Sequence, residues 1–273
     1  MKTHNLARAL ALAIAAGVIL HHGSASADAL DAIKARGTLV VGTKADYRPF
    51  GLRDASGAIV GFEPDLAKDI ANRLGVKLEL VPVVAANRIS LLTEGKLDLV
   101  IATMNITPER RKLVDFIEPA YYASGVNALA PKSQHLHVWQ QLRGRPVCMI
   151  EGAFYNAEIK QRYDPVIVSF KSTNEVYSAL KEGTCVAVAY DDTAIIGQLQ
   201  NPEWQDYEMP FSSILVEPWG MAVRLGETRF EELLSNLIKE WHRTGRVQEL
   251  EKTWHIPASA FADEMHRRYL ENQ

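Results

Sequence analysis

Residues 103–110 read TMNITPER, and this stretch decides the fold class. Residues 97–102, directly before it, form an apolar run that predicts a strand. Thr107 and Pro108 predict that a helix begins next, because threonine is a favourable N-cap and proline lacks only an N–H group that has no partner at the first helical position. A buried strand that leads straight into a helix is typical of α/β proteins with parallel sheets.

Arg110 is the candidate functional residue of this stretch. The predicted helix places it in the first turn, where the positive end of the helix dipole disfavours a cation. A bound carboxylate would compensate, because free helix N–H groups, the arginine fork and the polar groups of Thr103 and Asn105 all suit a carboxylate. An ion pair with a nearby acidic residue such as Asp115 is the other interpretation, and the stretch alone does not decide between them.

The alternation of strands and helices occurs twice along the chain. It runs through residues 38–116 and restarts, as a smaller unit, at residues 147–200. We therefore predict an α/β fold with two lobes, each a parallel-type sheet flanked by helices, joined by a two-segment hinge. The expected boundaries are 28–127 together with 219–273 for lobe 1, and 128–218 for lobe 2.

Residues 1–27 are predicted to be an export signal. Lys2 and Arg8 make its start basic, residues 9–20 are apolar but too short to span a bilayer, and residues 25–27 read Ala-Ser-Ala, a typical cleavage site. No cysteine adjoins this site, which argues against a lipid anchor. We therefore expect a periplasmic protein that is soluble after cleavage.

Charge and length limit the function classes. Removing the two basic residues of the signal leaves 28 lysines and arginines against 33 aspartates and glutamates, a net charge of −5. A mildly acidic surface argues against nucleic acid as a partner. His135 and His137 lie in an expected surface loop without cysteines or paired carboxylates nearby, so we predict no metal site. Nothing in the sequence calls for a cofactor.

The chain has two cysteines, Cys148 and Cys185, each in an apolar, strand-like run. In an oxidising compartment they would form a disulfide if the two strands are neighbours. Two buried free thiols are the alternative, and the sequence does not give the separation that would decide.

A second charged group follows the strand predicted at residues 185–190. Asp191 and Asp192 come directly after it, and ligands of open α/β sheets lie outside the carboxyl ends of the strands. We expect one aspartate to cap the next helix and Asp191 to face the interlobe cleft. A cation from one lobe and an anion from the other would together bind a zwitterion such as an α-amino acid. The alternative is that both aspartates are only cap and solvent groups.

Several short motifs, each weak alone, occur in an order that resembles the family 3 extracellular solute-binding proteins, the polar amino-acid receptors of ABC importers. The resemblance covers about residues 37–254. Its motifs are Gly42, Tyr47-Arg48-Pro49-Phe50, Gly61-Phe62-Glu63, Asp65-Leu66, Gly95-Lys96-Leu97-Asp98-Leu99, Asn105 to Arg110, and Asp115-Phe116. It implies a two-lobed, type II periplasmic binding protein that works as a monomer with a membrane permease.

The resemblance also implies roles for individual residues. The arginine at the Arg110 position binds the ligand α-carboxylate, the residues at Thr103 and Asn105 assist it, and the aspartate at Asp191 binds the α-ammonium group. An aromatic residue at the Tyr47 position covers the ligand.

The ligand side chain would meet two cations, because the resemblance places Lys44 and Arg88 beside it. Two cations favour an acidic or amide amino acid, and residues 86–92 look closest to glutamate/aspartate-binding proteins. One departure is Gly152-Ala153-Phe154, where family members often have Gly-Thr-Thr, so that hydroxyl groups are replaced by the apolar bulk of Phe154 in the pocket wall. The alternatives are solvent exposure of Lys44 and an ion pair of Arg88 with Glu63, Asp65 or Glu94.

Two other function classes stay open. A periplasmic enzyme similar to cyclohexadienyl dehydratase would use Glu151 or Glu217 as an acid in the cleft. A sensor that reports its ligand to a receptor kinase would have the same binding site. We nevertheless expect a binding protein rather than an enzyme.

Overall fold

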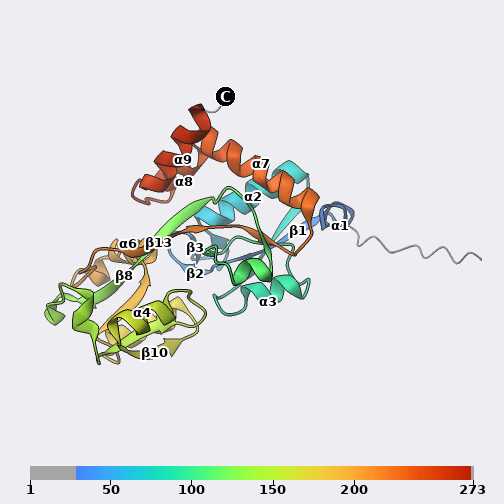
Figure 1. Ribbon diagram of the computed structural model, residues 1–273. Helices are drawn as coiled ribbons and strands as arrows, with labels where there is room; N and C mark the ends of the chain where they lie inside the picture. Colours follow the sequence, from blue (N-terminus) through green and yellow to red (C-terminus); the bar gives the residue numbers. More distant parts are fainter. Residues whose placement is uncertain (1–28, 272–273) are drawn as a thin grey trace, which may run out of the picture.

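The computed structural model describes residues 29–271, so the predicted export signal at 1–27 lies outside the described residues (Figure 1). Two sheets organise the chain. We call lobe 1 the part formed by residues 29–121 and 220–271, and lobe 2 the part formed by residues 122–219. In Figure 1 lobe 2, with its yellow and green elements, extends to one side of lobe 1.

Lobe 1 is built on a five-stranded sheet in which the first three strands are parallel and the last two pairings are antiparallel. The strand order is β5 (Lys77–Pro82), β1 (Thr38–Thr43), β6 (Leu99–Val100), β14 (Ala222–Val223) and β7 (Asp115–Phe116). A three-stranded ribbon follows β1 and consists of β2 (Asp46–Tyr47), β3 (Gly51–Arg53) and β4 (Ile59–Val60).

Successive residues of a strand point to opposite faces of a sheet, and β1 carries apolar side chains on both. Helices therefore cover both faces of this sheet. Leu39 and Val41 of β1 belong to the core that includes α1, α2 and α7, whereas Val40 packs in a second core with residues of α3. The helices of lobe 1 are α1 (Ala29–Arg36), α2 (Phe62–Leu74), α3 (Arg88–Thr93), α7 (Thr228–Thr244), α8 (Arg246–Thr253) and α9 (Ala260–Glu271).

Lobe 2 has a six-stranded sheet whose first three strands are parallel and whose remaining strands pair antiparallel. The order is β10 (Val166–Phe170), β9 (Pro146–Ile150), β11 (Ala187–Asp191), β8 (Tyr122–Pro131) and β12 (Tyr207–Glu208), and β13 (Ile214–Trp219) also pairs with β8. Its helices are α4 (Asn156–Tyr163), α5 (Thr173–Lys181) and α6 (Asp192–Leu199), with 3-10 turns η2 (Lys132–Gln134), η3 (Trp139–Leu142) and η4 (Pro202–Trp204).

Two antiparallel strands, β8 and β13, connect the lobes. Tyr122 lies opposite Trp219 at the point where both strands enter lobe 1, and an isolated bridge links Trp219 to Asn105. Trp219 is fully buried. The lobe boundaries expected from the sequence, 127/128 and 218/219, fall within β8 and β13 and stay predictions.

The prediction of a helix after Thr107 is wrong, because the structure has only a single 3-10 turn there, η1 (Arg110–Lys112). The residue that precedes this turn is Glu109 rather than Thr107, although the Thr107 hydroxyl oxygen does accept the Arg110 N–H at 3.3 Å. The turn cannot continue because β7 begins at Asp115 and pairs with β14. The helix-dipole argument for Arg110 therefore loses its basis, and the role of Arg110 depends on its other contacts.

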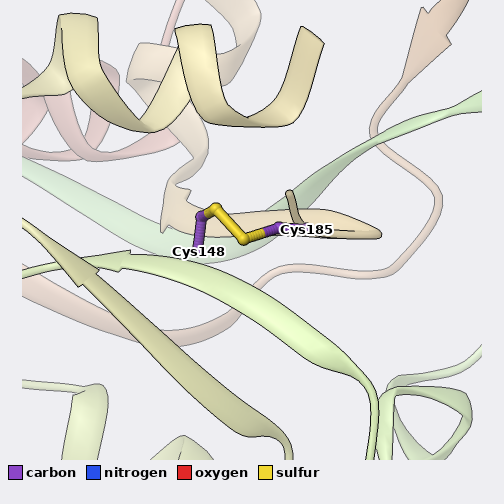
Figure 2. Close-up of a disulfide and its surroundings, with 2 residues drawn as sticks. All are labelled: Cys148 and Cys185. Carbon is purple, nitrogen blue, oxygen red and sulfur yellow. A yellow bond between two sulfur atoms is a disulfide. The ribbon is translucent and has the colours of Figure 1, made fainter. Parts of the chain in front are cut away.

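Cys148 in β9 and Cys185, just before β11, are joined in a disulfide with Cα atoms 5.7 Å apart (Figure 2). β9 and β11 are neighbouring parallel strands, with Val188 opposite Cys148. Both cysteines are buried. The bridge therefore ties together two central strands of lobe 2.

None of the helices within residues 29–271 is long and apolar enough to cross a membrane.

Replacing both cysteines by alanine (Cys148→Ala with Cys185→Ala) should lower the free energy of unfolding by about 3–4 kcal/mol. This is the loop-entropy estimate for two cysteines separated by 37 residues. Urea denaturation of the oxidised protein and the variant measures it, and the reduced wild type, which should unfold close to the variant, is the control. A loss below about 1 kcal/mol would contradict this estimate.

Candidate functional site

A narrow cavity lies between the two lobes, with about 20 Å³ of space open to a water-sized molecule. Of the eight residues predicted to bind ligand, seven line this cavity: Lys44, Arg88, Thr103, Asn105 and Arg110 from lobe 1, and Phe154 and Asp191 from lobe 2. The other lining residues are Ala85, Ile150, Ala153, Tyr155 and Tyr190. The structure thus brings together side chains from widely separated parts of the chain.

Strand ends bring these side chains together. Lys44 directly follows β1, Thr103 comes after β6, and Asp191 is the last residue of β11. Phe154 follows β9 by a short loop. The carboxyl ends of parallel strands meet at one edge of a sheet, and in this protein the edges of the two sheets face each other across the cavity.

Thr103 has a left-handed backbone with φ of 47°, which is rare for a β-branched residue. Two buried side chains hold this conformation. The Glu63 carboxylate accepts the Thr103 N–H at 2.6 Å, and Nη1 of Arg88 donates to the carbonyls of Thr103, at 3.3 Å, and Ala102. Burial raises the pKa of Glu63 to about 7, although a hydrogen bond from the Tyr121 hydroxyl opposes the shift.

Arg110 connects the two lobes. Its Nη1 donates to the Asn105 carbonyl at 2.8 Å, and its Nη2 donates to the Gly152 carbonyl of lobe 2 at 3.0 Å. Burial lowers the pKa of Arg110 to about 10, so the guanidinium stays charged at neutral pH. A guanidinium has five N–H donors, and these two contacts leave further donors for a ligand.

Gly152 lies where the lobes approach most closely at this contact. Its φ is 79°, a conformation that favours glycine, and a Cβ atom there would lie 3.0 Å from the Ala86 nitrogen of lobe 1. Any other residue would therefore have a strained backbone here and would require the neighbouring backbone to shift by a few tenths of an ångström.

Asp191 is buried, and a residue of the other lobe holds it. The Tyr47 hydroxyl donates to Asp191 Oδ2 at 2.9 Å and shares a hydrogen bond of 2.8 Å with the Thr193 hydroxyl. Burial raises the pKa of Asp191 to about 7, and the Tyr47 hydrogen bond partly opposes this shift. Tyr47 itself is not among the lining residues, because its ring packs edge-on against Phe50 and Trp219.

Asp192 has a different role from its neighbour. Its carboxylate accepts the Ser124 hydroxyl at 2.7 Å and the Gly125 N–H at 3.1 Å, so it fixes the start of α6 to the hinge strand β8. This leaves Asp191 as the aspartate that faces the cavity.

Lys44 is fully buried and forms an ion pair within its own lobe. Its Nζ lies 2.8 Å from Asp46 Oδ1. The other carboxylate oxygen, Oδ2, accepts the N–H of Thr173, the first residue of α5 in lobe 2, at 2.9 Å. Asp46 therefore links the cavity lysine to the opposite lobe, and sequence reasoning missed this residue.

Tyr155 and Tyr190 of the cavity wall were also missed. Burial and the nearby Asp191 charge raise the pKa of both hydroxyls. Their positions in the sequence could have indicated a place in the cavity wall. Tyr190 directly precedes Asp191 at a strand end, and Tyr155 directly follows Phe154.

Two buried polar atoms of the cavity residues make no hydrogen bond of good geometry within the described part of the chain. They are Nε of Arg88 and the hydroxyl oxygen of Tyr155. Buried polar groups in native proteins are nearly always paired, so unpaired ones at a cavity indicate a place for a polar ligand. Residues 29–271 contain no cluster of side chains that could hold a metal ion.

Residues 39–257 match the family model described as bacterial extracellular solute-binding proteins, family 3. The chain belongs to this family. Such proteins are extracellular or periplasmic, and the two-lobed α/β fold described above is the one shared by the solved amino-acid-binding proteins that it resembles.

Known relatives differ in the amino acid that their names give. The chain is 32% identical to the ABC transporter glutamine-binding protein GlnH of Bacillus subtilis over 83% of its own length and 84% of that protein. Its fold matches the solute receptor for L-cysteine of Neisseria gonorrhoeae with a TM-score of 0.80 and 28% identity, over 85% and 98% of the two chains. It also matches an ancestral amino acid-binding protein, a precursor of cyclohexadienyl dehydratase, with a TM-score of 0.75 and 31% identity, over 84% and 99% of the chains.

The raised pKa of Asp191 predicts how stability varies with pH in the ligand-free protein. Because the folded state binds this proton more tightly than the unfolded state, the contribution is present at low pH and is lost as pH rises toward about 7. The free energy of unfolding should therefore fall between about pH 5 and pH 7.5 by roughly 1–2 kcal/mol more in the wild type than in Asp191→Asn.

Denaturation at several pH values measures this difference. Glu63, which has a similarly raised pKa, is present in both proteins, so its contribution cancels in the comparison. Parallel pH profiles for the two proteins would show that Asp191 does not hold its proton in this way.

Proposed function

We propose that this protein binds a polar L-amino acid, with an acidic or amide side chain, between its two lobes and delivers it to the membrane permease of an ABC importer. In this proposal the N-terminal signal exports the chain to the periplasm, where it acts as a monomer. The observation that carries the proposal is that Arg110 of lobe 1 and Asp191 of lobe 2 line one buried cavity.

Opposite charges from separate lobes match the chemistry of an α-amino acid, which carries a carboxylate and an ammonium group on one carbon. Arg110 binds the carboxylate with the N–H donors that remain after its two carbonyl contacts. Thr103 and Asn105, next to it in the cavity wall, assist. Asp191 accepts the ammonium group, and Tyr47 keeps its carboxylate oriented.

The side chain of the ligand lies toward Lys44 and Arg88 in this proposal. Arg88 offers its unpaired Nε, which suits a carboxylate or amide oxygen. Phe154 forms an apolar wall, and two buried cations disfavour a ligand with a cationic side chain.

Closure of the lobes supplies the affinity. Each charged hydrogen bond formed away from water contributes about 1.5–3 kcal/mol. Several such bonds, less the entropy lost on binding, reach the roughly −8 kcal/mol of a micromolar complex. The ligand stabilises the closed state because the contacts from Arg110 and Asp191 act together only when the lobes meet.

One observation favours an enzymatic alternative enough to test it. Glu217 lines a second hollow together with Arg110 and Phe154, which places a carboxyl group beside the proposed carboxylate site. A dehydratase acting on prephenate or arogenate would release an aromatic product on incubation with either compound. Unchanged substrate together with amino-acid binding supports the transport function.

Arg110→Ala should weaken amino-acid binding at least 100-fold, because a desolvated arginine–carboxylate pair contributes two charged hydrogen bonds of about 1.5–3 kcal/mol each. Titration calorimetry with the amino acid that gives the largest thermal shift in a screen of proteinogenic amino acids measures the loss.

Arg111→Ala is the matched control. Arg111 is the next residue along the chain, but its side chain is exposed and pairs with Glu118 on the surface. Its removal should change affinity by less than about twofold, in line with the small contribution of surface ion pairs. Equal losses in the two variants, or none in Arg110→Ala, would rule out the carboxylate role of Arg110.

A further inference from the structure

The ion pair between Lys44 and Asp46 bears on which ligand side chain the cavity accepts. The family resemblance implies that Lys44 is a cation beside the ligand side chain, which favours acidic ligands. In the structure the Lys44 side chain is only 2% exposed, and its ammonium group lies 2.8 Å from Asp46 Oδ1. A buried charge already paired at this distance is a poor partner for a second carboxylate.

Asp46 is itself held in place from the opposite lobe. Its second oxygen accepts the Thr173 N–H at 2.9 Å, at the start of α5, where the first N–H groups of a helix have no partner within the helix. Asp46 thus pairs with the lysine by charge through Oδ1, without a hydrogen bond of good geometry, and accepts the lobe 2 N–H through Oδ2. The neutralisation of Lys44 is therefore part of the contact between the lobes.

The second cation near the ligand side chain is also engaged. Nη1 of Arg88 donates to two backbone carbonyls, and the Glu63 and Asp191 charges lie close enough to act on this guanidinium. Nε of Arg88, a cavity-lining residue, makes no hydrogen bond within the described residues, and the Tyr155 hydroxyl in the same wall interacts with the Asp191 carboxylate. A donor and a hydroxyl match the oxygen and NH₂ group of an amide as well as they match a carboxylate.

We infer that Asp46 is a specificity-determining residue, which withdraws Lys44 from the ligand so that the site selects an amide amino acid over the corresponding acid. This inference rests on the proposed function. A glutamate or aspartate ligand would bring an additional negative charge into a buried site where Asp46 already compensates the lysine. An amide ligand brings none.

Titration calorimetry of the purified protein with L-glutamine, L-glutamate, L-asparagine and L-aspartate tests the inference. The wild type should bind the better amide at least tenfold more tightly than its acid. Asp46→Asn keeps an oxygen that can accept the Thr173 N–H but removes the charge, so Lys44 becomes available. The amide-to-acid affinity ratio should then move at least tenfold toward the acid.

Two further variants isolate the cause. Asp54→Asn removes the same charge from the same lobe, at an exposed turn where Asp54 contacts only Ser56 and its neighbours, and should leave the ratio unchanged. Lys44→Gln combined with Asp46→Asn should lose the gain for the acid that Asp46→Asn alone produces. If Asp46→Asn does not fold, judged by its thermal unfolding, Asp46→Ser replaces it with the same expected change in the ratio.

The outcomes separate this inference from the proposed function. If the wild type binds amino acids but prefers the acid, or if Asp46→Asn and Asp54→Asn give the same ratio, the role of Asp46 is wrong and the proposed function stands. If the wild type binds no amino acid, both are wrong. A tenfold change that disappears in the double variant establishes the role of Asp46.

Discussion

The hydrogen bond from Tyr47 to Asp191 is the contact on which the interlobe site depends. It joins the aromatic cluster of lobe 1 to the end of a central strand of lobe 2. It also holds a buried carboxylate whose pKa is raised by the loss of water. A ligand ammonium group would give the buried carboxylate a positively charged partner. Such a partner would offset the cost of removing the carboxylate from water.

Buried hydrogen bonds within lobe 1 hold its edge of the cavity. Glu63 and Arg88 hold the backbone of Thr103 in a conformation that it would not adopt alone. All three residues are buried. Because their arrangement does not have to form on binding, little ordering entropy is lost at this edge.

Much of the site could be predicted from the sequence because strand ends carry local signals. Apolar runs followed by polar residues indicated that Thr103 and Asp191 lie at strand ends beside the cavity. Arg110 was indicated because it is a basic residue shortly after one of these strand ends. The helix at Arg110 could not be judged correctly, because its length depends on the pairing of β7 with β14, a strand from the other end of the chain. The place of Tyr47 was missed for a similar reason, since its hydroxyl contacts Asp191 of the second lobe and no local pattern encodes that contact. The Lys44–Asp46 pair is local, but the sequence does not show that Lys44 is buried beside Asp46.

The disulfide gives lobe 2 a mechanical property that matters when the cavity opens. Cys148 and Cys185 fasten β9 to β11, and these strands lead to Gly152 and Asp191, two of the points where lobe 2 contacts lobe 1. Because this bridge is covalent, β9 cannot separate from the segment that leads into β11 while the cysteines are oxidised. Any change in the distance between the Gly152 and Asp191 contacts must then come from the loop and strand end beyond the bridge.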